Sequence, residues 1–423
     1  MDFKGKILII SAEALNSSTS NGGTLLRHIS GLDPSQISQF YIHGDPDPSV
    51  CHHYFQVSDH DALNYFLGRK KQPRTKTAGN SSDSEKTVKR SHKNLVLRNL
   101  VWLSYRWWTP EFEAFVRESD PDAILFQAGD MAFIFSIALR LSKKLNVPIL
   151  MYNSEYYVLK KRMYYGASAF DIWLRTLHLM LKSYYKKFMK KAYFCFYVSE
   201  DLEAAYQKKY PHPGRSAALY NTSGIESVPD KHDPDQFRLF FCGNLGLGRV
   251  DSMLELAEVL NDVDPEAKID LYGRFVADGD YERLIVAENI VFRGTVAYEE
   301  LPALMAKAAM IVCAESSIMM ENHKYLFSTK IADCLSCGRP FLVYATREYP
   351  FVQYLERYDA AHIAATQEEL KTVLTKCRED LDYRNSKTEN ALALAAKNHR
   401  AEVNHQIVDK VLCSIPVKGS TED

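Results

Sequence analysis

A lysine stands at the predicted start of a helix near residue 330, where a positive charge needs an explanation. Ser328 and Thr329 are residue types that cap helix N-termini. Gly338, with a proline two residues after it, would end the helix. The first turn of a helix carries partial positive charge and free N–H groups, so Lys330 is electrostatically misplaced there unless an anion lies in front of it. The spacing therefore predicts an anion-binding helix start.

A second segment with anion-binding chemistry joins a predicted strand at residues 237–242 to a predicted helix at residues 251–260. It contains three glycines and ends in an arginine, with Gly243, Gly246 and Arg249 as the residues of interest. Glycine lets a backbone approach a phosphate closely, and a guanidinium pairs with phosphate bidentately. This segment is a second candidate for a phosphate contact.

The run Ser-Thr-Lys-x-x-Asp-x-x-x-x-Gly-Arg-Pro resembles the donor-binding signature of GT-B glycosyltransferases, especially the family-4-like enzymes (glycosyl transferases group 1). The resemblance implies that Lys330 contacts the diphosphate of a nucleotide sugar and that Asp333 holds the ribose hydroxyls. It places the glycine-containing segment at the same diphosphate, so we expect Arg249 to meet Lys330 there. Tyr325 stands where many members of the family carry a glutamate that contacts the donor sugar.

The resemblance also places Thr295 and Val296, after a predicted strand, beside the nucleobase. The predicted donor-binding residues are Gly243, Gly246, Arg249, Thr295, Val296, Tyr325, Ser328, Thr329, Lys330 and Asp333, with Arg249 and Lys330 as the catalytic residues. Two cations that stabilise a departing nucleoside diphosphate can replace a metal ion. We therefore expect no metal and no cofactor, only a nucleotide sugar of UDP or GDP type as co-substrate.

Candidate acceptor residues lie in the N-terminal half. A buried strand is predicted at residues 6–11, followed by a polar loop and a helix that begins near Thr24. Asn21, Gly22 and Gly23 resemble the Gly-Gly loop on the acceptor side of GT-B enzymes, although a simple turn is an equally good interpretation. Glu155 follows another predicted strand, where it is either a polar site residue or a surface carboxylate.

Strands and helices alternate along the whole chain, which is typical of parallel sheets. We predict an α/β protein with two Rossmann-like domains (GT-B) facing each other across a cleft. The predicted parts are an N-terminal acceptor domain at 1–222 with a disordered basic insert at about 68–94, a linker at 223–236, a C-terminal nucleotide-sugar domain at 237–390, and a helix at 391–423 that returns to the N-terminal domain.

Composition excludes some classes of function. The 423 residues include 52 Lys and Arg against 53 Asp and Glu, and this balance gives no reason to expect a nucleic-acid partner. The start of the chain shows no signal peptide, and no run reaches the ~18 apolar residues of a spanning helix, so we expect a cytoplasmic protein. Cys334 and Cys337 form a lone C-x-x-C, which favours reduced structural thiols over metal ligands.

A helix predicted at residues 174–192 carries one apolar stripe and several lysines. Its basic surface could rest on anionic lipid at the inner face of a membrane, which would suit a lipid-linked acceptor. The ordinary interpretation is a surface helix with a core-facing stripe and solvated lysines. Neither interpretation is excluded by the residues alone.

The leading hypothesis is a metal-independent hexosyltransferase that moves a sugar from a nucleotide sugar to a saccharide, lipid-linked or protein acceptor, as in polysaccharide biosynthesis. The resembled family is usually retaining. The alternatives are a GT-B nucleotide-sugar epimerase and a non-catalytic, degenerate transferase that binds a partner. A dinucleotide-dependent oxidoreductase ranks lower, because the glycines at 243, 246 and 248 run in the reverse spacing from G-x-G-x-x-G.

Overall fold

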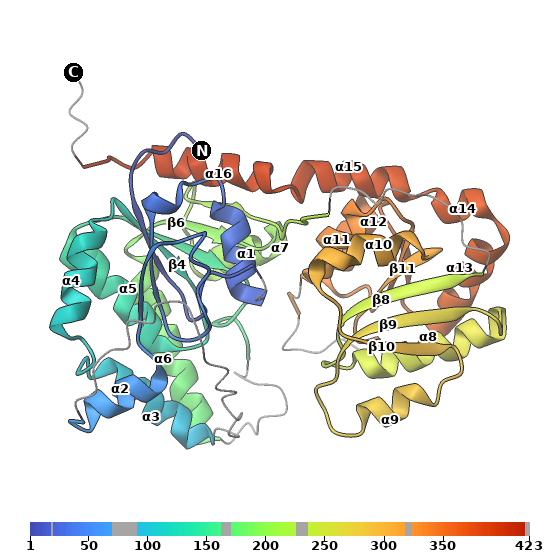
Figure 1. The fold of residues 1–423 in the computed structure, drawn as a ribbon, viewed down its shortest axis with the longest axis horizontal. Helices are drawn as coiled ribbons and strands as arrows, with labels where there is room; N and C mark the ends of the chain where they lie inside the picture. Colours follow the sequence, from blue (N-terminus) through green and yellow to red (C-terminus); the bar gives the residue numbers. More distant parts are fainter. Residues whose placement is uncertain are drawn as a thin grey trace. The chain divides into compact units, whose positions relative to one another are not determined.

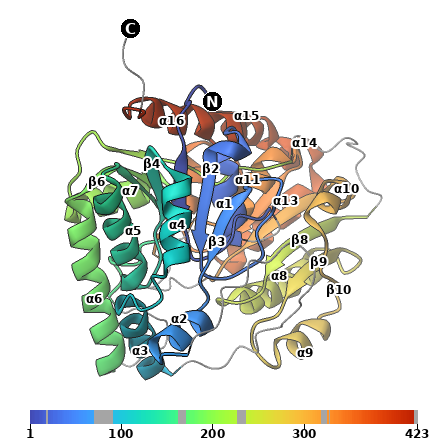
Figure 2. The same cartoon turned by 60° about the vertical axis from the view of Figure 1, so that its left-hand side comes forward.

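The protein folds into two compact units, each built on one parallel sheet (Figures 1 and 2). One unit comprises Met1–Leu219 and His405–Asp423, and the other comprises Tyr220–Asn404. The structure is a computed structural model, and it describes residues 1–17, 20–69, 91–161, 171–225, 236–317, 324–325 and 327–418. The predicted fold class, an α/β protein with two parallel sheets, is confirmed.

The sheet of the first unit has seven parallel strands in the order β3-β2-β1-β4-β5-β6-β7. The strands are β1 (Ile7–Ile10), β2 (Ile37–Tyr41), β3 (His53–Gln56), β4 (Ala123–Gln127), β5 (Ile149–Asn153), β6 (Ala192–Tyr197) and β7 (Ser216–Ala218). The helices are α1 (Ser20–Ile29), η1 (Pro34–Gln36), α2 (Asp59–Phe66), α3 (His92–Leu103), α4 (Pro110–Ser119), α5 (Ala132–Leu145), α6 (Ile172–Met189), α7 (Glu200–Lys209) and α16 (Ala401–Cys413), the last of which begins in the other unit.

Helices cover both faces of this sheet, which explains why every residue of its central strands β1, β4 and β5 is buried and most are apolar. On one face Phe126 of β4 packs against Phe135 of α5 and Phe188 of α6, with ring centroids 4.8 and 5.2 Å apart. On the other face Ile7 of β1 shares a buried cluster with residues of α1 and with Val408 of α16. Figure 2 shows α5 and α6 side by side.

The second unit has six parallel strands in the order β10-β9-β8-β11-β12-β13. They are β8 (Arg238–Asn244), β9 (Lys268–Arg274), β10 (Ile290–Gly294), β11 (Met310–Ala314), β12 (Phe341–Tyr344) and β13 (His362–Ala364). Its helices are α8 (Arg249–Val263), α9 (Asp280–Ile285), η2 (Tyr298–Glu300), α10 (Leu301–Ala306), α11 (Lys330–Ser336), α12 (Pro350–Arg357), α13 (Gln367–Glu379), α14 (Leu381–Asn385) and α15 (Thr388–Asn398).

Two predicted segments lie largely outside the described residues. They are the basic insert, of which 70–90 are not described, and the linker, of which 226–235 are not described. The insert was predicted to continue to residue 94, but α3 begins at His92, because the Ser91 hydroxyl caps it by accepting the N–H of Asn94 at 3.3 Å.

The helix predicted at 174–192 is α6, and it ends at Met189, before β6 begins at Ala192. Its apolar stripe, which includes Leu177, Leu181 and Phe188, is buried in the core of the unit. This is the arrangement that the ordinary surface-helix interpretation predicts. None of the helices in the described ranges is long and apolar enough to cross a bilayer.

Candidate functional site

The glycine-containing loop between β8 and α8 is closed by the side chain of Arg249. Gly248 precedes α8 with a φ of +80°, which glycine adopts at low cost. Nη1 of Arg249 donates to the backbone carbonyls of Asn244 at 3.2 Å and Gly246 at 3.4 Å. The N–H of Gly246 donates in turn to Oδ1 of Asn244 at 2.6 Å. Arg249 therefore fixes the loop in which it was predicted to act as a phosphate ligand.

Arg249 and Lys330, predicted to meet, lie beside the same carboxylate at the end of β11. Nε of Arg249 lies 2.6 Å from Oε2 of Glu315, and Nζ of Lys330 lies 3.4 Å from Oε1. Glu315 is only 1% exposed. Burial raises its pKa, but Lys330 and Arg249 outweigh that effect and hold the pKa below its usual value. The two cations converge on a charged protein anion, which the sequence analysis did not include among the site residues.

The side chain of Lys330 lies over Gly243. A Cβ atom at residue 243 would approach Cδ of Lys330 to 2.9 Å and Nζ to 3.2 Å. Nζ also lies 5.3 Å from the ring centroid of Phe241 on β8. Glycine at 243 thus leaves space for the lysine, in addition to the close phosphate approach for which it was predicted.

Asp333, predicted to hold ribose hydroxyls, accepts hydrogen bonds from two protein hydroxyls. Its Oδ1 lies 2.6 Å from Oγ of Ser223 and 2.7 Å from Oη of Tyr298. The Tyr298 hydroxyl also accepts the N–H of Gly224 at 3.0 Å. Burial and the nearby Asp333 carboxylate raise the pKa of Tyr298 to about 12, so Tyr298 is a hydrogen-bond donor at neutral pH. The hydroxyls of Ser223 and Tyr298 thus donate two hydrogen bonds to the carboxylate, as the two hydroxyls of a ribose would.

The other predicted donor residues lie in the same unit. Thr295 and Val296 directly follow β10 and precede the short helix that carries Tyr298. Tyr325 is half-buried, with Nζ of Lys324 5.8 Å from its ring centroid. Ser328 is buried and Thr329 is exposed. Thr329 is the N-cap residue of α11, as predicted, but it has helical backbone angles and its hydroxyl makes no cap hydrogen bond.

The predicted cysteine pair is buried in α11 and after it. Cys334 and Cys337 are both free thiols, and the Sγ of Cys337 donates to the carbonyl of Cys334 at 3.2 Å. Burial raises the pKa of Cys337 to about 12. Both residues are thus protonated core side chains, as the structural interpretation predicts.

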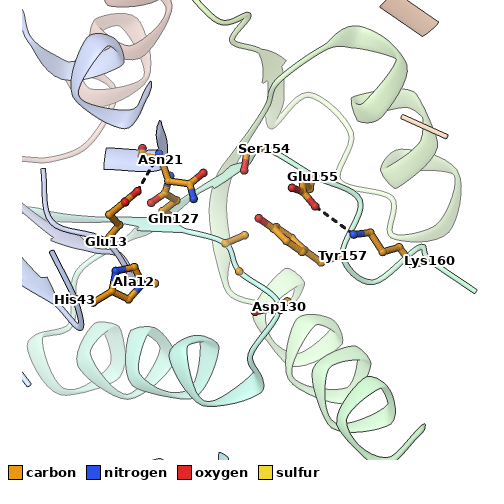
Figure 3. Close-up of a pocket in the computed structure, with 12 residues that line it drawn as sticks. Ala12, Glu13, Asn21, His43, Gln127, Asp130, Ser154, Glu155, Tyr157 and Lys160 are labelled. Carbon is orange, nitrogen blue, oxygen red and sulfur yellow. Dashed lines mark hydrogen bonds and ion pairs between the residues drawn. The ribbon is translucent and has the colours of Figure 1, made fainter. Parts of the chain in front are cut away.

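A pocket of about 370 Å³ opens in the first unit, at the carboxyl ends of β1, β4 and β5 (Figure 3). It is lined by Ala12, Glu13, Asn21, His43, Gln127, Ala128, Gly129, Asp130, Ser154, Glu155, Tyr157 and Lys160. Two predicted acceptor-side residues, Asn21 and Glu155, are among these. Ligands in parallel α/β sheets collect at such strand ends. Most of the lining was not identified from the sequence, although the position of Glu13 and Gln127 at strand ends was a usable signal.

The predicted polar loop at 16–23 is partly wrong, because Asn21, Gly22 and Gly23 lie in the first turn of α1. The reason is a cap from outside the helix. Oε2 of Glu13 accepts the N–H groups of Asn21 at 2.9 Å and Gly22 at 3.0 Å (Figure 3). A carboxylate at a helix N-terminus satisfies free donors and complements the helix dipole, which allows two glycines to remain helical.

The pocket carries more acidic than basic side chains. Glu155 lies 3.2 Å from Nζ of Lys160, and its side chain is 53% exposed (Figure 3). Glu13 and Asp130 add two further carboxylates, whereas the basic side chains among the described lining residues are Lys160 and His43. A cavity of this size with polar groups on several sides can hold a small polar molecule. Its charge favours a neutral ligand over an anionic one.

The comparisons with known proteins agree with this arrangement. Residues 252–408 match the family model described as glycosyl transferase-like. HepE from Anabaena, solved in complex with UDP and glucose, superposes with a TM-score of 0.65 at 13% identity, over 97% of this chain and 100% of that chain. Sucrose-phosphate synthase from Thermosynechococcus elongatus gives a TM-score of 0.63 at 13% identity, over 97% and 99% of the two chains.

A candidate UDP-N-acetylglucosamine 2-epimerase from Listeria monocytogenes has a related fold, with a TM-score of 0.54 at 11% identity, and the alignment covers 99% of both chains. No curated protein sequence matches this chain. These similarities confirm the predicted GT-B fold. The family match adds that residues 252–408, most of which lie in the second unit, form a glycosyl transferase-like region.

Proposed function

We propose that this protein transfers a sugar from a nucleoside-diphosphate sugar, with UDP as the nucleotide. The observation that carries the proposal is the convergence of Arg249 and Lys330, distant in sequence, on one position at the end of β11. A solved complex of the HepE fold with UDP supports UDP as the nucleotide. In this proposal Lys330 contacts the diphosphate, Arg249 holds the loop that receives it, and Asp333 contacts the ribose.

These residues would act by stabilising negative charge. When the bond between the sugar and the diphosphate breaks, charge develops on the departing phosphate oxygens. A lysine already close to the diphosphate stabilises that charge without a metal ion, which is the metal-independent mechanism we propose. We propose retention of the anomeric configuration on the family resemblance alone. The anomeric configuration of the product tests this proposal.

The acceptor would bind in the pocket of the first unit. Its excess of carboxylates supports an acceptor that presents neutral hydroxyl groups, such as a saccharide. The ligand would lie among hydrogen-bonding side chains on three strand ends, including Asn21, Gln127 and Ser154. Saccharide binding sites need several such donors and acceptors at fixed positions.

The first test is thermal unfolding with UDP, GDP and NAD. We expect UDP to raise the melting temperature, because a ligand that binds only the folded state stabilises it by mass action, and NAD to have no effect.

The second test is turnover of a panel of labelled UDP-sugars. Lys330→Met should lower kcat/KM by about 100- to 1,000-fold, as expected for loss of a group that stabilises the leaving charge.

Lys371→Met is the matched control, because Lys371 on α13 forms an exposed ion pair with Asp262 near the C-terminal end of α8 and has no contact with Glu315 or Arg249 among the described ion pairs. It should retain full turnover. If Lys330→Met retained it too, the assignment of the diphosphate site would be wrong. Absence of any UDP-sugar turnover would favour the non-catalytic interpretation.

An epimerase is the second candidate, since an epimerase-type protein shares the fold. The labelled product distinguishes the two. A transferase releases UDP and gives a larger glycoside only when an acceptor is present, whereas an epimerase converts the UDP-sugar into its epimer without one. We expect the first result, because the acidic pocket of the first unit offers a separate site for an acceptor.

A further inference from the structure

Glu315 lies between the two cations of the proposed donor site. We propose that this carboxylate is an internal anion, which binds Lys330 in the nucleotide-free protein and releases it to the donor diphosphate. The inference rests on the proposed function and identifies a residue that sets the nucleotide affinity of that site. Glu315 lies directly after β11, is 1% exposed, and approaches Arg249 and Lys330 through different oxygen atoms.

The two cations are bound to Glu315 unequally. Nε of Arg249 lies 2.6 Å from Oε2, its Nη1 donates to two loop carbonyls, and its side chain is 9% exposed. Nζ of Lys330 is 3.4 Å from Oε1, beyond the about 2.8 Å of a charge-assisted hydrogen bond, and the side chain is 18% exposed. Oε1 has no hydrogen-bond partner within the described part of the chain. Arg249 is therefore the fixed partner of Glu315, and Lys330 is the cation that can leave.

Among the described residues, no second ion pair of Lys330 opposes that movement. Its side chain lies on Gly243, where an added Cβ would meet Cδ at 2.9 Å. The ammonium also lies 5.3 Å from the ring centroid of Phe241, a contact that favours a cation without fixing its direction. Lys330 can thus turn from the carboxylate toward an anion without breaking another ion pair in the described part of the chain.

Glu315 opposes the diphosphate in two ways. It forms an ion pair with Lys330, the lysine that would otherwise bind the phosphates, and its negative charge repels the phosphates directly. With both cations counted, the cluster carries a net charge of +1 instead of the +2 it would have without the carboxylate. Removing the charge of Glu315 should therefore strengthen nucleotide binding, whereas removing a carboxylate that only positions Lys330 should weaken it.

Asp270 provides a matched control in the same sheet. It too lies between two cations, with oxygens 3.0 Å from Nε of Arg238 and 2.9 Å from Nε of Arg293. It is a residue of β9 and has no part in the loop of Arg249 or in the contacts of Lys330. Asp270→Asn thus removes one carboxylate from an equivalent cluster without touching the proposed site.

The experiment is calorimetric titration of UDP into the full-length native protein, Glu315→Gln and Asp270→Asn. We expect Glu315→Gln to bind UDP roughly tenfold more tightly, and pyrophosphate more tightly by a similar factor. Asp270→Asn should bind both ligands as the native protein does. Unchanged or weaker UDP binding by Glu315→Gln would overturn the inference, and so would an equal gain in Asp270→Asn.

Glu315→Asp is the second variant, in case Glu315→Gln does not fold. It retains a negative charge for the buried Arg249, but its carboxylate is one methylene shorter and cannot hold both cations. We expect an affinity for UDP between those of the native protein and of Glu315→Gln, and unchanged or weaker binding would count against the inference. If the native protein bound neither UDP nor pyrophosphate, the proposed function would fail as well, whereas equal binding by all variants would remove only the role of Glu315.

Discussion

In both units, the candidate site lies at the carboxyl ends of parallel strands, but the two sites carry excess charge of opposite sign. In the second unit, two cations and one buried glutamate meet beside β8 and β11, and the excess charge is positive. In the first unit, the strand ends of β1, β4 and β5 open into a pocket with an excess of carboxylates. Both units have parallel sheets covered by helices on both faces, so the difference comes from a few side chains at the loops.

This difference indicates how two similar units can divide one reaction. A positive site suits a diphosphate, and an acidic pocket with amide and hydroxyl groups suits a neutral saccharide and disfavours a phosphate. If the division is correct, substitutions in one unit should change the binding of one substrate only. Three substitutions test it, and they are taken from the largest expected effect to the smallest.

The largest effect is expected from Arg249→Ala. The variant leaves Glu315 buried beside Lys330 alone and removes the hydrogen bonds that close the loop. Losing one partner of a buried ion pair costs about 3–5 kcal/mol, and we expect the free energy of unfolding in urea to fall by that amount. UDP binding should be lost as well.

Arg238→Ala is the control for this prediction. The ion pair of Arg238 with Asp270 is more exposed, and Asp270 keeps Arg293 as a partner, so we expect the free energy of unfolding to fall by about 1 kcal/mol or less. Equal losses in both variants would contradict the buried role of Arg249.

A smaller effect is expected from Glu13→Ala in the first unit. Its carboxylate accepts two N–H groups at the start of α1 and also lines the pocket. Loss of the cap should lower the free energy of unfolding by about 1 kcal/mol. The KM for the acceptor should rise, while the affinity for UDP stays unchanged in calorimetry. A weaker affinity for UDP would show that the two units do not divide the substrates as proposed.

The sequence was sufficient for the features that depend on local pattern. Alternating apolar strands and amphipathic helices predicted both parallel sheets, because periodicity and strand-end geometry are encoded over short distances. The convergence of Lys330 and Arg249 was predicted from the resemblance of their segments to the GT-B donor-binding signature, because local pattern does not bring two distant segments together.

Features that depend on distant partners were missed. The start of α1 was predicted near Thr24, because Asn21-Gly22-Gly23 has turn character. The helix begins earlier because Glu13, which precedes it, caps the N–H groups of Asn21 and Gly22. Helix propensity alone does not reveal a cap of this kind. Glu315 was not among the predicted site residues, because only the fold shows that it contacts two cations. The hydroxyls that meet Asp333 come from a loop, in the case of Ser223, and from the short helix η2, in the case of Tyr298, and they have no motif of their own.

The smallest effect on substrate binding is expected from Tyr298→Phe, which tests how the second unit recognises the nucleoside. Tyr298 donates to Asp333 at 2.7 Å and accepts the N–H of Gly224, so its loss should lower the free energy of unfolding by about 0.5–1.5 kcal/mol. If Asp333 reads the ribose, as we propose, Tyr298→Phe should still bind UDP more tightly than 2′-deoxy-UDP, because the carboxylate remains. Asp333→Asn should lose that preference. Should the phenylalanine variant lose the preference while Asp333→Asn keeps it, the tyrosine hydroxyl and not the carboxylate would be the group that recognises the ribose, and the assignment of Asp333 would have to move to Tyr298.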